Sequence, residues 1–162
     1  MKKQGFTLIE LMVVIVIMGI LAAVAVPKLF GMIAKSKASE VGPAAGTYVK
    51  LQQAYFSERS EAGGWQLIGY MAPGVNSKTT NFEYYPGEDF GTVGSAALTT
   101  SDKLGWKAKN IATLNECPIG DNWMVQMKIN EGSATAQDII FTSQVTAGGC
   151  AALTPTFDKI GK

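Results

Sequence analysis

The stretch that decides the fold is GFTLIELMVVIVIMGILAAVAV, residues 5 to 26. From Phe6 to Val26 its only polar side chains are those of Thr7 and Glu10. A helix of this length rises roughly 31 Å, which is about the thickness of the hydrocarbon core of a bilayer. We therefore expect residues 6–26 to form a membrane-spanning helix.

Two other interpretations of this apolar stretch are weaker. A secretory signal peptide has a shorter apolar core followed by a small-residue cleavage site, whereas here the glycine junction precedes the apolar run. A buried helix would need protein on every side, and the rest of the chain is too short and too polar to enclose it. Lys2 and Lys3 precede the span and favour a cytoplasmic N-terminus, with the rest of the chain outside.

The N-terminus combines a short basic leader, Gly5, the sequence Phe-Thr-Leu-Ile-Glu and a long apolar run ending before Pro27. This arrangement resembles the N-terminus of the type IV prepilins, a family that includes the pseudopilins of secretion systems. The resemblance implies that a prepilin peptidase removes residues 1–5 and methylates the new amino group of Phe6. The resemblance is sharp over about the first 35 residues and only architectural beyond them.

Glu10 is the one carboxylate of the apolar run, and a charge inside a span costs about 2.5 to 3.5 kcal/mol at mid-helix. The resemblance assigns it a partner, the Phe6 ammonium group of a neighbouring subunit. A Phe6 ammonium in the same chain lies one helical turn away, so self-pairing and neighbour-pairing compete. Charges that meet only in one axial register would penalise misregistered subunits, so Glu10 would specify register. In a third interpretation, which stays open, Glu10 snorkels at the membrane interface.

Gly19 and Pro27 bracket the stretch where we expect the helix to be weakest. Pro27 cannot donate a backbone hydrogen bond to Ala23, and a glycine weakens a helix by about 1 kcal/mol relative to alanine. The resemblance implies that this stretch can unwind within a filament. A simple kink at Pro27 is the alternative, and the residues do not decide between the two.

The helix should continue through residues 28–56, beyond the span. Small and apolar side chains at spacings of three, four and seven predict one buried stripe, made of Ala34, Ala38, Val41, Ala45, Tyr48 and Tyr55. The complementary face should be solvated, and it carries Lys35, Lys37, Glu40 and Lys50. Gly42–Pro43 predicts a bend near Pro43, with a full break into two helices as the alternative. The whole helix, 6–56, would be about 75 Å long and must project.

A globular head should occupy residues 57–162, because Gly, Ser, Thr and Asn become frequent there. Turn-forming residues predict a surface loop over 61–81, with a short ordered piece at 65–70. Runs of β-branched and aromatic residues predict strands at 82–85, 105–108, 123–130 and 138–145.

The third predicted strand shows the clearest alternation. Trp123, Val125 and Met127 alternate with more polar or flexible neighbours, which is typical of a sheet with one buried face. We expect that face to pack against Tyr48 and Tyr55 of the helix. The predicted fold class is α+β, with a long apolar N-terminal helix, half transmembrane and half amphipathic, on a small antiparallel sheet.

Cys117 and Cys150 are the only cysteines, and the membrane orientation places both outside the cytoplasm, where disulfides form. We expect them to be bonded, because neither histidine nor Cys-x-x-Cys spacing is present to suggest a metal or redox site. A bond closing a loop of about 34 residues stabilises a fold by roughly 3.8 kcal/mol in the chain-entropy estimate. It would enclose the last two strands, much as a C-terminal disulfide loop does in many type IV pilins.

Residues that suggest catalysis or ligand binding are scarce. The sequence has no histidine, phosphate-binding glycine loop, calcium-loop pattern or Asn-x-Ser/Thr sequon. Glu88 and Asp89 form the only adjacent carboxylate pair, and two acidic neighbours in a glycine-rich turn are more often solvated charge than a glycosidase acid and base. We expect no enzymatic activity, no metal and no cofactor.

The charge balance predicts no nucleic-acid partner. Taking Lys2 and Lys3 from the 14 basic side chains leaves 12 against 13 acidic ones. The lysines at 103, 107 and 109 around Trp106 form a small cluster, which is typical of a solvated strand face. The head aromatics could offer a carbohydrate-stacking face, but we expect them in the core: Trp65, Tyr70, Tyr84, Tyr85, Trp106 and Trp123.

Three functions of different classes therefore compete. The resemblance favours a structural subunit of a type IV pilus, a homopolymer built through the N-terminal helix for surface adhesion or motility. Its partners would be the prepilin peptidase, the inner membrane before assembly and the pilus assembly machinery, and its final location a filament on the cell surface. The alternatives are a pseudopilin of a type II secretion system and a signal-anchored binding domain that never polymerises. Glu10 and the Gly5 junction argue against the last, because a plain anchor needs neither.

Overall fold

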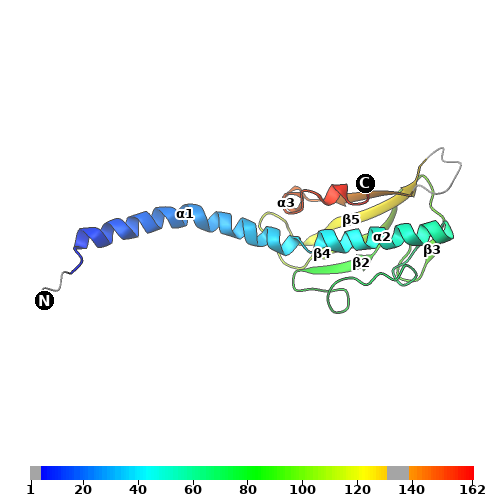
Figure 1. The fold of residues 1–162 in the computed structure, drawn as a ribbon, viewed down its shortest axis with the longest axis horizontal. Coiled ribbons are helices and arrows are strands. Elements are labelled where there is room, and N and C mark those ends of the chain that lie inside the picture. The colour runs from blue at the N-terminus through cyan, green and yellow to red at the C-terminus, as the bar shows by residue number, and fades with distance from the viewer. Residues whose placement is uncertain (1–4, 131–138) are drawn as a thin grey trace.

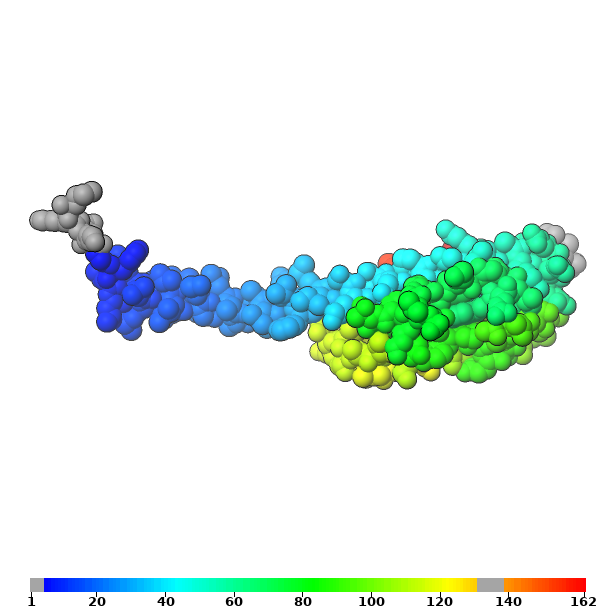
Figure 2. All heavy atoms as spheres, turned by 90° about the horizontal axis from the view of Figure 1, so that it is seen from below, coloured from blue at the N-terminus to red at the C-terminus, as the bar shows by residue number. Residues whose placement is uncertain are grey.

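The computed structural model describes residues 5–130 and 139–162. Two helices in line form its longest feature, α1 over Leu8–Ala38 and α2 over Val41–Arg59 (Figure 1). α1 projects from the head as a bare rod, whereas α2 lies along the head (Figure 2). The predicted α+β class, a long N-terminal helix with an antiparallel sheet and one disulfide, is confirmed.

The two helices are separated by a turn at Ser39 and Glu40. Pro43 lies in the first turn of α2, where a proline is tolerated, but in a continuous helix its ring would clash with the Ser39 carbonyl. The chain therefore breaks one turn before Pro43. The predicted interruption near Pro43 is therefore found one turn earlier, where it divides the helix into α1 and α2. The backbones of Ser39 and Glu40 stay in the right-handed helical region, and the two helices keep nearly the same direction (Figure 1).

α1 remains helical through Gly19 and Pro27. The helix continues past Pro27 without a break, although Pro27 donates no backbone hydrogen bond, and the helix axis curves gently (Figure 1). Unwinding of this stretch concerns an assembled filament, and it stays a prediction.

Four antiparallel strands form the main sheet in the order β2-β4-β5-β6. Their bounds are Phe82–Pro86, Lys103–Asn110, Gly120–Ile129 and Ile139–Val145. The four predicted strands are therefore confirmed, but β4 and β5 begin earlier than predicted. Asp138, the predicted start of the last strand, lies outside the described residues.

β4 is longer at both ends than the predicted strand, because its lysines obscure the strand pattern in the sequence. Lysines at 103, 107 and 109 interrupt the apolar alternation, and the β4–β5 register shifts at two points. Charged side chains at half-buried strand positions give no period-two signal, so the sequence showed only the centre of the strand.

Smaller elements complete the head. β1 (Ala62–Gly63) pairs with β3 (Ser95–Ala96), and the C-terminal segment carries α3 (Gly148–Ala151) and a 3-10 helix, η1 (Phe157–Lys159). Backbone hydrogen bonds turn the chain at 64–70, where the short ordered piece was predicted. β1 was not predicted, because two residues give no periodic pattern.

The core lies between α2 and the sheet. Tyr48 of α2 and Trp106, Val125 and Met127 of the sheet are fully buried. A side chain on Gly105 would collide with the Tyr48 hydroxyl and the Met127 methyl group, so this glycine lets helix and sheet approach closely. The predicted packing is thus confirmed at Tyr48.

Tyr55 is half-buried and lies against Gly63 of β1. The other members of the predicted stripe, Ala34, Ala38, Val41 and Ala45, are all buried. Five of the head aromatics lie in the core as expected, and only Tyr85 is partly exposed.

Gln52 joins α2 to the head by polar contacts that the sequence pattern did not reveal. Its buried amide donates to the Gly63 carbonyl (2.9 Å) and to the Tyr48 hydroxyl (3.0 Å), and it accepts from the Gly63 N–H (3.1 Å). A paired amide is cheap to bury, whereas an unpaired one is costly. Gln52 therefore fixes the position of β1 on α2.

Candidate functional site

The projecting part of α1 presents apolar side chains to the outside on every face. Within the described residues, the only helix long and apolar enough to cross a membrane is the one that begins at Leu8, and its apolar window is wholly unburied. Phe6 is 84% exposed, and exposed apolar side chains continue as far as Ile33. A helix that is apolar all round needs lipid or protein around it. This segment is therefore an interaction site for a membrane, for other copies of the helix, or for both in turn.

Glu10 forms a capping box with Thr7 at the start of α1. Its carboxylate accepts hydrogen bonds from the Thr7 N–H (2.8 Å) and the Thr7 hydroxyl (2.7 Å), and its own N–H donates to the Thr7 hydroxyl (3.4 Å). A capping box satisfies two N–H groups that would otherwise lack partners. The Thr-x-x-Glu spacing carried this signal, which the sequence analysis missed.

Gly5 and Phe6 lie just before this cap, in an exposed segment without regular secondary structure. No atom outside the immediate chain lies within 4 Å of a Cβ placed on Gly5. Phe6, Ile9, Glu10, Val13 and Val14 line one shallow apolar hollow, so the predicted processing junction and the Glu10 carboxylate share one end of the helix.

Gly19 and Pro27 lie further along the exposed rod. A Cβ on Gly19 would meet open space, so this glycine is not required by packing within the chain. Pro27 borders a groove between α1 and the head. Neither residue lines the hollow beside Glu10. The predicted assembly residues are therefore spread along the helix and do not form one site.

Cys117 and Cys150 form a disulfide, and both residues are completely buried. The bond closes a loop that contains β5 and β6, as expected from the sequence. It also joins the turn before β5 to α3, at the end of the head from which α1 projects (Figure 1).

Loss of this bond should destabilise the head strongly. For the Cys117→Ser/Cys150→Ser double variant we expect the free energy of unfolding to fall by about 3 to 4 kcal/mol, because the unfolded chain regains the entropy of an open loop. Denaturant unfolding of the full chain in detergent micelles measures it. Reduction of the parent protein should give the same loss, and an unchanged midpoint for both would contradict the prediction.

Ion pairs hold two of the three lysines in the basic cluster of β4, Lys103 and Lys107. Lys103 pairs with Asp89 (3.1 Å), and Lys107 pairs with Glu88 and, at 3.9 Å, with Asp121. Asp89 also accepts the Leu104 N–H at 2.6 Å. Glu88 and Asp89 thus serve as partners of a strand face rather than facing each other across a cleft. Over residues 5–130 and 139–162, no group of three potential ligands gathers to hold a metal ion.

Glu40 differs from the sequence prediction, because it is not a solvated charge. At the turn between the helices, its carboxylate accepts hydrogen bonds from the hydroxyls of Thr79 (2.5 Å) and Tyr84 (3.1 Å). Burial, followed by the neighbouring Glu40 charge, raises the pKa of Tyr84 far above its usual value. Glu40 therefore ties the break in the long helix to the loop that leads into β2.

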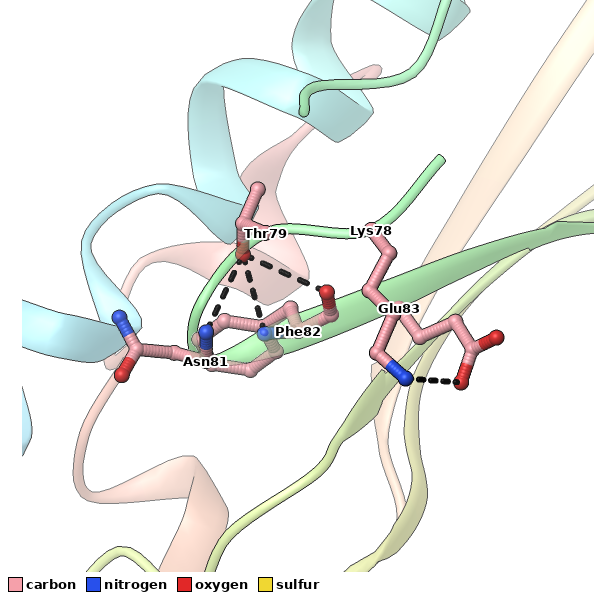
Figure 3. Close-up of polar contacts among 5 residues, drawn as sticks. All are labelled: Lys78, Thr79, Asn81, Phe82 and Glu83. Carbon is pink, nitrogen blue, oxygen red and sulfur yellow. Dashed lines mark hydrogen bonds and ion pairs between the residues drawn. The ribbon is translucent and has the colours of Figure 1, made fainter. Parts of the chain in front are cut away.

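The Thr79 end of this tie is itself fixed by the backbone. Its hydroxyl accepts from the N–H groups of Asn81 (3.3 Å) and Phe82 (3.0 Å), while Lys78 and Glu83 approach to 4.0 Å beside it (Figure 3). The turn thus presents Thr79 to Glu40 in a defined orientation.

Removal of the Glu40 carboxylate should cost stability at this junction. For Glu40→Ala we expect the free energy of unfolding to fall by about 1 to 3 kcal/mol. Tyr84 is only 2% exposed, and its hydroxyl would lose its hydrogen-bond acceptor. The matched control is Glu58→Ala, at an exposed position of α2, which should change stability little. Equal unfolding midpoints for both variants would show that the tie contributes nothing.

Comparisons with known proteins bear on the N-terminal segment and on the whole chain. Residues 1–26 match the family described as the prokaryotic N-terminal methylation motif. The chain is 33% identical over 137 residues to a type IV major fimbrial protein, FimA, of Dichelobacter nodosus, and this alignment covers 84% of the chain and 71% of the relative. The chain belongs to the type IV pilin family.

Two further relatives of this pilin match over shorter regions. The type IV major pilin protein PilA of Myxococcus xanthus is 45% identical over 58 residues, 36% of this chain and 26% of the relative. The fimbrial protein EcpC of Eikenella corrodens is 39% identical over 79 residues, 49% of this chain and 52% of the relative. The pilin therefore aligns with only about a quarter to a half of these two relatives. No solved structure matches it.

Proposed function

We propose that this pilin is the structural subunit of a type IV pilus and polymerises through its N-terminal helix. The observation that carries the proposal is the exposed apolar surface of α1. The N-terminal end of this helix carries the Thr7–Glu10 capping box and lies within the methylation motif. Its relatives are named major pilin and major fimbrial proteins, which supports a filament rather than a secretion piston. They also support a structural role rather than an enzymatic one.

The proposed life of the subunit has two stages. The precursor spans the inner membrane through residues 6–26 with its head outside, and a prepilin peptidase cuts after Gly5 and methylates Phe6. The assembly machinery then moves the helix from lipid into the filament core, where other copies of α1 replace the lipid around its apolar faces. Lipid in the first stage and neighbouring helices in the second both cover the apolar surface of α1 that the head leaves exposed.

Glu10 acts in the second stage of this proposal. In the membrane its charge is compensated locally by Thr7 and the open helix N-terminus. In the filament the Phe6 ammonium of a neighbouring subunit becomes its partner, and only one axial stagger brings the two together. Gly19 and Pro27 supply the weak stretch that lets α1 adapt to its neighbours.

Deletion of the coding sequence tests the function directly. Surface filaments seen by electron microscopy should disappear and should return when the parent sequence is supplied in trans. A deletion strain with unchanged filaments would exclude a major structural role. Filaments that persist while secretion of a folded protein fails would favour the pseudopilin alternative.

A further inference from the structure

The exposed apolar surface of α1 extends beyond the predicted span. Phe30 is 60% exposed, Met32 66% and Ile33 42%, and the first buried residue of the helix is Ala34 at 4%. From Phe6 to Ile33 a helix rises about 42 Å, which equals a whole bilayer including both headgroup regions rather than its hydrocarbon core alone. Ala34 is the first residue of α1 that the head buries, so the head stands close to the membrane–water interface on the side away from the cytoplasm.

Three lysines lie on α1 at this level. Lys28, Lys35 and Lys37 are exposed, and no acidic residue occurs between Glu10 and Glu40. None of the three takes part in an ion pair with any other described residue. Side chains on a helix lean toward its N-terminus, so these ammonium groups lean toward the membrane.

The position of these lysines opposes the usual charge asymmetry of membrane proteins. Cationic residues normally concentrate on the cytoplasmic side of a span. This chain has Lys2 and Lys3 on that side but three lysines just beyond the span on the other. These three lysines place positive charge at the level of the outer-leaflet headgroups, where anionic lipid phosphates lie.

The head base offers a place for such a ligand. We use this name for residues 113–116 and 149–153, two segments joined through the Cys117–Cys150 disulfide. An open groove of about 530 Å³ runs between α1 and the head base, with Lys28 and Lys35 on one wall and Glu116 and Gly149 on the other. A second, smaller hollow lies beside Lys37 and Thr113. In Figure 1, α3, which contributes to the head base, lies at the end of the head from which α1 emerges.

The chemistry of the groove fits one kind of occupant. Two lysines face a single carboxylate, Glu116, in the larger hollow, and Lys37 adds a further positive charge nearby. Exposed Phe30 and Met32 line the same groove between Lys28, which lies nearer the span, and Lys35, which lies nearer the head. Lysines on both sides of an apolar patch match an anionic phospholipid, whose phosphate pairs with the ammonium groups while its glycerol and upper acyl groups contact Phe30 and Met32.

We propose that this groove binds the phosphate groups of anionic phospholipids in the outer leaflet of the inner membrane. The bound lipids hold the head at a fixed height on the membrane before α1 is withdrawn. The inference rests on the membrane-anchored precursor of the proposed function, but it does not require polymerisation. Release of these lipids then accompanies entry into the filament.

Competition between spin-labelled lipids tests the inference. The full-length precursor is placed in phosphatidylcholine vesicles, and electron paramagnetic resonance compares the protein-bound fractions of labelled phosphatidylglycerol and labelled phosphatidylcholine. For the parent chain we expect a preference for phosphatidylglycerol of roughly fivefold or more at low salt, which falls as ionic strength rises. The triple variant Lys28→Gln/Lys35→Gln/Lys37→Gln should reduce the preference to about twofold or less. It removes both lysines of the groove and the one beside the smaller hollow.

A matched variant separates the groove from total charge. Lys50→Gln/Lys159→Gln/Lys162→Gln removes the same charge from exposed positions on the head and should keep the preference of the parent. Equal losses in both variants would overturn the proposal, as would a parent chain without lipid preference. If a second copy of the chain occupied the groove instead, an amine-reactive reagent would cross-link Lys35 of one copy to Lys35 of the other. The two labelled lipids would then bind equally, which would overturn the proposal. Carbonate extraction checks membrane anchorage separately, so failure of anchorage is distinguishable from failure of lipid selection.

Discussion

Glu10→Val should abolish filament assembly while the variant still enters the membrane and is still cut after Gly5. Insertion should persist because the substitution makes the span more apolar. Assembly should fail because the Phe6 ammonium of each neighbouring subunit would be buried without a partner, and an unpaired buried charge is strongly destabilising. We expect the yield of sheared filaments to fall at least tenfold.

The capping box supplies a matched pair of controls for this prediction. In Glu10→Gln the side-chain oxygen can still accept from Thr7, since glutamine also completes a capping box, but the charge is gone. Thr7→Val removes the Thr7 hydroxyl and leaves the charge in place. If charge sets the register, Glu10→Gln should fail to assemble and Thr7→Val should assemble.

Filament yield is measured on gels of sheared surface material, and insertion by resistance to carbonate extraction. Normal assembly of Glu10→Gln, together with failure of Thr7→Val, would mean that Glu10 acts as a cap. Parental yields from Glu10→Val would support the interfacial snorkelling interpretation and remove the main reason to assign a polymerising subunit.

Gly5→Trp should trap the uncut precursor in the inner membrane and leave no filaments. A Cβ at position 5 has no neighbouring atom within 4 Å and the residue is exposed, so we expect the substitution to leave the fold of the head unchanged. Its effect would come from the peptidase, which needs a small residue on the leader side of the bond according to the family resemblance. Gly19→Ala is the matched control, because position 19 is equally open and lies away from the junction.

Intact-mass analysis follows the cleavage. The parent and Gly19→Ala should give a chain that starts at methylated Phe6, whereas Gly5→Trp should retain Met1. Assembled filaments whose subunits still carry residues 1–5 would show that the proposed processing is wrong.

The features predicted from sequence are those whose signal lies in local periodicity or in a small count. The four strands, the buried stripe at Tyr48 and the pairing of Cys117 with Cys150 are of this kind, since alternation, helical spacing and two cysteines suffice. Thr7 and Glu10 also carry a local signal, because the Thr-x-x-Glu spacing is that of a capping box.

The features that were not predicted depend on contacts between residues far apart in the chain. Glu40 was expected in solvent because its helix face carries lysines, yet its partners at 79 and 84 approach only after the loop folds back. Likewise, Lys103 and Lys107 looked like a basic cluster until Glu88, Asp89 and Asp121 came beside them. Residue spacing carries no information on such pairs.

Negative-stain electron microscopy of sheared cell-surface material, with mass spectrometry of the same preparation, tests the central claim most directly. The account predicts filaments whose main polypeptide is residues 6–162 of this sequence, with a methylated N-terminus and with Cys117 bonded to Cys150. A preparation without filaments, in which the chain stays monomeric in the membrane fraction, would contradict the claim.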